Sequence, residues 1–231
     1  MVQSEFGTCR KQHYHSLHKM IIDTLIFDYG GVVADHYCEP YQGRLAAALG
    51  TTREHARELV SERSPHGRAY RLNQLSKSEF WGEVVRLAEV KGANDDELQQ
   101  LWAETYIPNV AVLSLLNYLR DEVAAQTGIV MNEDYWRYEY IENTYALKER
   151  VSLVVASFEI GAVKPDKAFY EAILARARRT VAPERVLYFD ARSRASEHAP
   201  ECHERPPARW NPRNPFPMWA GRSSLMRRVP T

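Results

Sequence analysis

The chain has 231 residues, which is enough for one large domain or for a domain with a smaller insert. Hydrophobic residues make up 45% and charged residues 26%, the balance of an ordinary globular protein. The formal net charge of +0 provides no overall attraction to nucleic acid or to acidic membranes, so we expect neither as a partner.

Two further features of the sequence concern the cellular compartment of the protein. The three cysteines lie far apart, with neither a metal-binding spacing nor a disulfide framework. No apolar run approaches the roughly 20 residues that span a bilayer, and residues 1–19 lack the apolar core of a signal peptide. We therefore expect a cytoplasmic protein in which residues 1–19 are an extension outside the fold. The sequence leaves the oligomeric state open.

The first expected element is a strand over residues 20–28, an aliphatic run without polar alternation. Such a run is typical of a strand buried on both faces of a parallel sheet. Residues 36–125 then form a largely helical block, in which Ser76 precedes Glu79 at the spacing of a capping box. We find no convincing strand between residues 36 and 110.

Strands and helices alternate after this block. Three strands are expected within residues 125–132, 152–157 and 185–190, with helices over 134–151 and 164–179. This order predicts a Rossmann-like parallel α/β sheet, in which ligands bind at the carboxyl ends of the strands. Asp28, Asn132 and Asp190 each lie at such an end, and Lys164 follows another. We expect these four residues to converge.

The last segment, residues 200–231, breaks the pattern. It contains seven of the chain's 12 prolines, mixed with arginines. Proline at this density prevents helices and central strands, so we predict a disordered tail. No strand is expected after Asp190, although a sheet of this kind usually has one more.

Four stretches together resemble the haloacid dehalogenase (HAD) superfamily of hydrolases, in its phosphatase-like subgroup with a helical cap. They are "LIFDYGGVVAD", "GIVMNED", "EIGAVKPDKAFY" and "VLYFDAR". The resemblance covers residues 20–199, and its most specific part is the Lys-Pro-Asp run followed by a tyrosine. It implies a core of residues 20–35 and 126–199, with residues 36–125 as the cap.

The resemblance also implies a mechanism. Asp28 would attack phosphorus and form a covalent ester that water later hydrolyses. Lys164 would offset negative charge on the nucleophile and on the transferring group. Mg²⁺, which prefers oxygen ligands, would be held by Asp28, the backbone carbonyl of Gly30 and Asp190. The implied substrate is a small phosphate monoester.

Three residues are expected to bind this substrate. Gly30 and Gly31 let the backbone turn tightly and bring amide donors close to the substrate, and Asn132 ends the second motif. An alternative for Asn132 is a cap on the following helix.

The sequence departs from the family pattern at three positions. Gly30 stands where family phosphatases usually have a second aspartate as general acid and base, although some members of the subgroup have glycine. Met131 replaces a serine or threonine and cannot donate a hydrogen bond. Ala191 follows Asp190 where a second acid is usual.

These departures keep other interpretations open. Asp28 could be an acid that only caps the turn after its strand. The protein could be a 2-haloacid dehalogenase, which uses the same nucleophile without a metal. It could also be a catalytically silent relative with a binding or regulatory role, or a truncated product.

Overall fold

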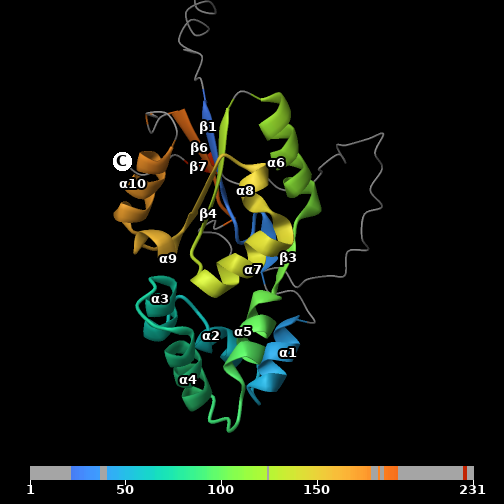
Figure 1. Cartoon of the computed structure of the whole chain (residues 1–231), viewed down its shortest axis with the longest axis vertical. Helices are drawn as coiled ribbons and strands as arrows, with labels where there is room; N and C mark the ends of the chain where they lie inside the picture. The colour runs from blue at the N-terminus through green and yellow to red at the C-terminus, as the bar shows by residue number, and fades with distance from the viewer. Residues whose placement is uncertain are drawn as a thin grey trace, which may run out of the picture.

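The computed structural model of the chain describes residues 22–36, 41–123, 125–177, 182, 185–191 and 226–227. An α/β part built on a sheet lies at one end of the molecule and a bundle of helices at the other (Figure 1). The expected extension over residues 1–19 lies outside the described residues, as does nearly all of the tail over residues 200–231.

The sheet has the strand order β5-β4-β1-β6-β7. The bounds of these strands are Leu153–Ala156 (β5), Gln126–Met131 (β4), Thr24–Asp28 (β1), Val186–Phe189 (β6) and Met226–Arg227 (β7). The first four are parallel, and β7 pairs antiparallel with β6. Asp28 is in register with Val130 on one neighbour of β1, and Phe27 is in register with Phe189 on the other. The predicted parallel α/β sheet is confirmed.

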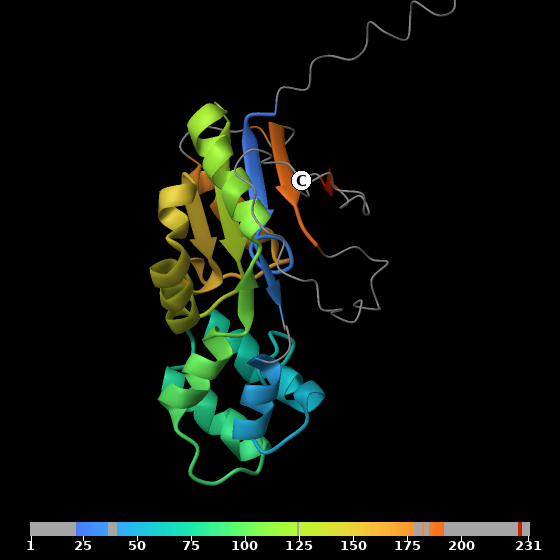
Figure 2. The same cartoon turned by 90° about the vertical axis from the view of Figure 1, so that its right-hand side faces the viewer.

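Helices cover both faces of this sheet (Figure 1). Figure 2 looks toward one of these two faces. The helices are α6 (Val110–Glu122), α7 (Tyr135–Tyr145), α8 (Leu147–Arg150), α9 (Ser157–Ile160) and α10 (Lys167–Arg176). Successive residues of β1 enter different cores, since Phe27 packs with Leu116 of α6 and Ile26 packs with Phe169 of α10. This two-sided burial explains why the strand reads as a continuous apolar run.

The helical cap has a hydrophobic core of its own. Its helices are α1 (Tyr41–Ala48), α2 (Arg53–Leu59), α3 (Pro65–Arg71), α4 (Lys77–Leu87) and α5 (Asp95–Ala103). Phe80, Trp81 and Trp102 are fully buried at its centre. The expected capping box at the start of α4 is present, because Ser76 and Glu79 bond each other's backbone amides. No helix in the described part of the chain is long and apolar enough to cross a membrane.

The junction between cap and core differs from the expectation. A short antiparallel ribbon of β2 (Ala34–His36) and β3 (Tyr106–Pro108) joins the two parts, so the prediction of no strand between residues 36 and 110 is wrong. Helix α6 then packs on the sheet, which ends the cap before residue 125. Three-residue strands carry no readable periodicity, and an amphipathic helix does not reveal which surface it covers.

The prediction of no strand after Asp190 is also wrong. The described residues Met226 and Arg227 pair with Phe189 and Tyr188 at the edge of the sheet. A pairing of two residues at the edge of a sheet is made by backbone groups, so the pattern of side chains in the sequence does not predict it.

We predict that Leu116→Ala lowers the free energy of unfolding by about 2–5 kcal/mol, because it leaves a cavity between α6 and the sheet. The matched control is Leu115→Ala, which removes the same atoms from a side chain that is 37% exposed rather than 0%. We expect the control to change stability by less than about 1 kcal/mol. Urea unfolding measures both, and equal losses would contradict the assignment of α6 to the core.

Candidate active site

The site is centred on Asp28, the last residue of the central strand β1. Lys164, in the loop between α9 and α10, donates a hydrogen bond from Nζ to Asp28 Oδ1. Both side chains are buried, with exposed fractions of 5% for Lys164 and 4% for Asp28. The structure therefore brings the two expected catalytic residues into direct contact. A buried carboxylate and ammonium of this kind each need the other's charge.

Asn132, just after β4, holds the backbone of Lys164 in place. Its Oδ1 accepts a hydrogen bond from Lys164 N at 2.8 Å, and its Nδ2 donates to Lys164 O at 3.1 Å. The same Nδ2 donates to Glu62 Oε2 at 2.9 Å, and Glu62 belongs to the cap. Asn132 thus positions the lysine and also connects the core to the cap. Its side chain does not cap α7, which Asp134 does instead.

The glycine pair has two different roles. Gly31 has a φ of +81°, and a Cβ added to it would lie 2.7 Å from the Cβ of Ala191, so both conformation and space require glycine. Its amide donates to Ala34 O at 2.7 Å, within the loop. Gly30 lines the cleft between cap and core, and Gly31 is absent from the cleft lining. Of the two, only Gly30 is placed where a substrate would lie.

Asp190 lies at the same edge of the sheet as Asp28. It follows β6 directly, and the preceding residues Phe189 and Phe27 are in register and stacked with ring centroids 4.6 Å apart. Asp190 is partly exposed and does not line the cleft. The register of β6 with β1 therefore places it next to the nucleophile.

The expected Mg²⁺ ligands are two carboxylates, Asp28 and Asp190, and the carbonyl of Gly30. All are oxygen donors at neighbouring strand ends, which is the chemistry that Mg²⁺ prefers. The described residues contain no group of three or more His, Cys, Asp or Glu side chains that could hold a metal. Two carboxylates and one carbonyl would leave the remaining positions around a bound Mg²⁺ to water and substrate oxygens.

A cleft of about 760 Å³ opens above these strand ends. Its floor includes Asp28, Gly30, Met131, Asn132 and Lys164, and its other side belongs to the cap. The cap residues that line it are Arg57, Glu58, Ser61, Glu62, Arg63, Ser64 and Arg71.

Arg71 connects the cap to the core beside this cleft. The guanidinium is buried and donates to three carbonyls, those of Asn132 at 3.1 Å, Gly67 at 2.9 Å and Val60 at 3.2 Å. Ser157 Oγ in turn donates to Arg71 O at 2.9 Å. These bonds fix the cap segment that carries Glu62 against the end of β4.

A second buried connection crosses the ribbon. Arg137 of α7 donates to Glu133 Oε2 at 3.4 Å and to Thr105 Oγ1 at 2.6 Å, and Tyr106 donates to Glu133. The side chains of Arg137 and Glu133 are 1% and 3% exposed. Breaking a buried pair of this kind costs about 3–5 kcal/mol.

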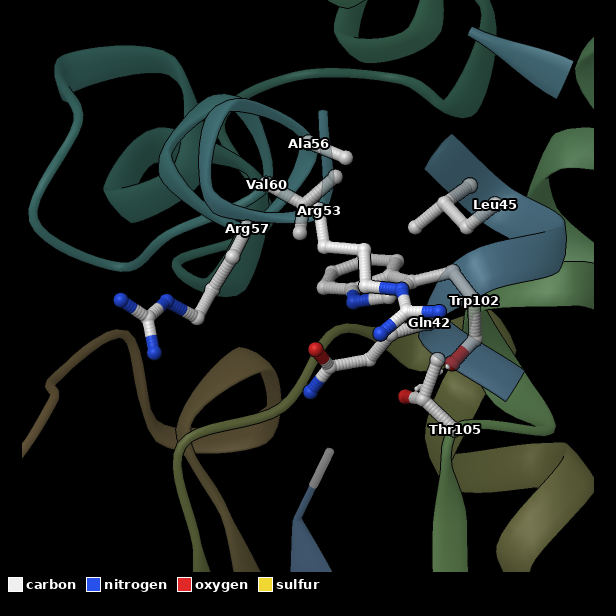
Figure 3. A pocket seen from close by; sticks show the side chains of 8 residues that line it. All are labelled: Gln42, Leu45, Arg53, Ala56, Arg57, Val60, Trp102 and Thr105. Carbon is white, nitrogen blue, oxygen red and sulfur yellow. Dashed lines mark hydrogen bonds between the residues drawn. The ribbon is translucent and has the colours of Figure 1, made fainter. Parts of the chain in front are cut away.

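Trp102 of the cap packs against both of these arginines. The guanidinium carbon of Arg137 lies 4.5 Å from its ring centroid and that of Arg71 lies 5.0 Å away. A small hollow borders the same tryptophan inside the cap (Figure 3), but its volume of about 10 Å³ holds at most about one water molecule. Arg57 also borders this hollow, and its guanidinium points away from Trp102 (Figure 3).

Sequence reasoning missed the cap side of the site and the buried arginine of α7. Glu62 and Arg71 of the cap, and Arg137 of α7, lie in segments that read as ordinary helix or turn. No local motif marks them, because each acts through a partner that is distant in sequence. The separation is 70 residues for Glu62 and Asn132, and 61 for Arg71 and Asn132.

No family model and no curated protein matches the chain, but solved structures do. A HAD family enzyme from Bacteroides thetaiotaomicron, in complex with magnesium and inorganic phosphate, has a TM-score of 0.60 at 16% identity, covering 72% of this chain and 83% of that one. A predicted HAD-like family hydrolase from Porphyromonas gingivalis has a TM-score of 0.58 at 18% identity, with coverages of 73% and 81%. An L-2-haloacid dehalogenase from Xanthobacter autotrophicus has a TM-score of 0.50 at 16% identity, covering 73% of this chain and 69% of that one.

These similarities show the fold. The protein has the fold of the HAD superfamily hydrolases, an α/β core with a parallel sheet and helices on both faces. The expected fold class is confirmed.

One group beside the site makes stability depend on pH. Burial, followed by the charge of Glu133, raises the pKa of Asp134 from 3.8 to about 6. Its Oδ1 accepts from Arg137 N at 3.1 Å, whereas Oδ2 is buried without a hydrogen-bond partner in the described structure. The folded state therefore binds this proton more tightly than the unfolded state. The resulting stabilisation is complete below the unfolded pKa and is lost as the pH rises through about 6.

We predict that Asp134→Asn raises the free energy of unfolding relative to wild type more at about pH 8 than at about pH 4. The expected increase in this difference between the two pH values is about 1–3 kcal/mol. Asparagine keeps the oxygen that caps α7 and removes the titration. Urea unfolding of both proteins at the two pH values measures this difference. A difference that is the same at both pH values would contradict the shifted pKa.

Proposed function

We propose that the protein is a hydrolase that cleaves small phosphate monoesters through a covalent aspartyl-phosphate on Asp28. The observation that supports this best is the buried contact of Asp28 with Lys164 at the carboxyl end of the sheet, below a cleft whose other side is formed by the cap. Ligands of open α/β sheets bind at this edge. The structural neighbour in complex with magnesium and inorganic phosphate agrees with this chemistry.

Asp28, Lys164 and Asn132 have different roles in the proposed reaction. A carboxylate oxygen of Asp28 forms the bond to phosphorus, and water later cleaves that bond. Lys164 stabilises negative charge on the nucleophile and on the transferring group, in a site largely removed from water. Asn132 fixes the backbone of Lys164, which keeps the ammonium directed at Asp28. Met131 offers no hydroxyl, so one donor that would bind a phosphoryl oxygen is missing.

The cap supplies positive charge to the cleft. Arg57 and Arg63 line it and are exposed, and neither guanidinium has a carboxylate partner among the described residues. The other cleft cations are engaged, as Lys164 is with Asp28 and Arg137 with Glu133. The two cap arginines therefore favour an anionic substrate.

Magnesium belongs to this proposal. Asp28, the carbonyl of Gly30 and Asp190 would hold it, as their oxygen chemistry allows. When bound, the ion neutralises phosphoryl charge that would otherwise repel the Asp28 carboxylate.

A second candidate is dehalogenation of a 2-haloacid by the same nucleophile. Gly30 and Met131 favour it, because attack on carbon with halide departure needs neither a proton donor nor a donor to a phosphoryl oxygen. The similarity to an L-2-haloacid dehalogenase structure agrees with it. A catalytically silent relative would show neither activity in turnover assays.

We predict that Asp28→Asn lowers kcat for phosphate monoesters by on the order of 10³-fold or more, because it removes the nucleophile. The control is Asp35→Asn, an exposed acid on the nearby ribbon, which we expect to leave kcat within about threefold of wild type. Acid quenching during turnover should trap phosphate on Asp28 of the wild type, and mass spectrometry locates it. Unchanged turnover in Asp28→Asn would overturn the proposal.

We predict that EDTA abolishes phosphatase activity and that added Mg²⁺ restores it, because the phosphoryl charge would no longer be neutralised. Phosphate release before and after metal addition measures this. Halide release from a 2-haloacid that persists in EDTA, without phosphatase activity, would establish the second candidate instead.

A further inference from the structure

The proposed reaction needs a group that moves protons. An alkoxide leaving group must take up a proton, and the water that attacks the aspartyl-phosphate must lose one. Gly30 has no side chain to do this, and Lys164 already donates to the nucleophile Asp28. The group must therefore come from elsewhere in the cleft.

Four other titratable groups in the cleft could transfer a proton: Glu58, Glu62, Glu133 and Tyr106. Glu133 and Tyr106 are buried and bonded to each other, and Glu133 also pairs with Arg137. Glu58 is exposed, with its carboxylate 3.9 Å from the His55 ring. Glu62 bonds to Asn132, the residue that holds the catalytic lysine.

A continuous chain of contacts joins Glu62 to the nucleophile. Glu62 Oε2 accepts from Asn132 Nδ2 at 2.9 Å, and Asn132 holds both backbone groups of Lys164. Lys164 Nζ then reaches Asp28 Oδ1. The cap carboxylate therefore lies above the strand ends, on the side from which a substrate enters.

The segment that carries Glu62 is firmly held. Arg71 donates to Val60 O at 3.2 Å before it, and Ser64 Oγ accepts from Gly67 N at 3.0 Å after it. A Cβ added to Gly67 would lie 2.0 Å from Ser61 O, so α3 packs directly on this turn. A general acid or base requires such a fixed position.

We propose that Glu62 is the general acid and base of this site, a role that rests on the proposed phosphatase activity. In the first step Asp28 forms a bond to phosphorus, the ester P–O bond breaks, and the protonated Glu62 gives its proton to the leaving alkoxide. In the second step the Glu62 carboxylate takes a proton from water as the water oxygen bonds to phosphorus. The Asp28–phosphorus bond breaks, phosphate leaves, and Glu62 is protonated again.

The test compares Glu62→Gln with wild type on two substrates that differ in the leaving group. An alkyl phosphate needs a proton on its leaving oxygen, whereas 2,4-dinitrophenyl phosphate does not. We expect Glu62→Gln to lower the single-turnover rate of phosphoenzyme formation from the alkyl phosphate by about 10²–10⁴-fold. With the dinitrophenyl ester we expect a burst of dinitrophenol at close to the wild-type rate, followed by slow release of phosphate.

Glu54→Gln is the matched control, since it makes the same change at an exposed position of α2 outside the cleft lining, and we expect it to behave as wild type on both esters. Equal losses on the two esters in Glu62→Gln, or a loss no larger than that of Glu54→Gln, would overturn the assignment. Urea unfolding of each variant shows whether it is folded, and Glu62→Asp, which keeps the carboxyl group, should recover part of the rate if Glu62 transfers protons. A wild type that neither turns over nor becomes phosphorylated on Asp28 would instead overturn the proposed function, and the inference with it.

Discussion

The buried contact between Asp28 and Lys164 is the interaction on which the arrangement of the site depends. Taking both charges out of water is costly, and only a close partner for each offsets that cost. The two residues are 136 positions apart, so the contact requires the whole α/β core to be assembled. Asn132 completes the arrangement, because it binds the amide and the carbonyl of Lys164 and leaves the ammonium little freedom.

The cap joins this core through buried polar contacts as well as through the ribbon. Arg71 reaches from the cap to the end of β4, and Arg137 reaches from α7 to Thr105 beside the cap. Trp102 lies against both guanidinium groups. Such contacts hold the cap in one orientation, since each buried donor loses its partner if the cap moves away. That orientation places cap side chains over the nucleophile.

The structure shows what surrounds two of the departures from the family pattern, Ala191 and Met131. A Cβ on Gly31 would lie 2.7 Å from the Cβ of Ala191, so the residue after Asp190 leaves room only for glycine at position 31. Met131 is buried in the core cluster with Phe27 and Ile129, and thus contributes packing where a hydroxyl would contribute a hydrogen bond. The core side of the cleft therefore lacks this one donor. The exposed arginines that line the cleft, Arg57 and Arg63, belong to the cap.

The sequence by itself determined the parallel sheet and the candidate residues at its carboxyl edge. Buried strands read as apolar runs. Asp28 ends one of them, Asn132 follows the next and Lys164 comes shortly after a third, so local patterns were sufficient. Only the tertiary structure decided that α6 covers the sheet, that β7 extends it, and that Glu62 and Arg71 meet Asn132. These features depend on contacts between distant segments and on backbone pairing of two or three residues. Neither produces a periodic pattern of apolar residues in the sequence, because the surface that a helix or an edge strand contacts is defined only in the folded chain.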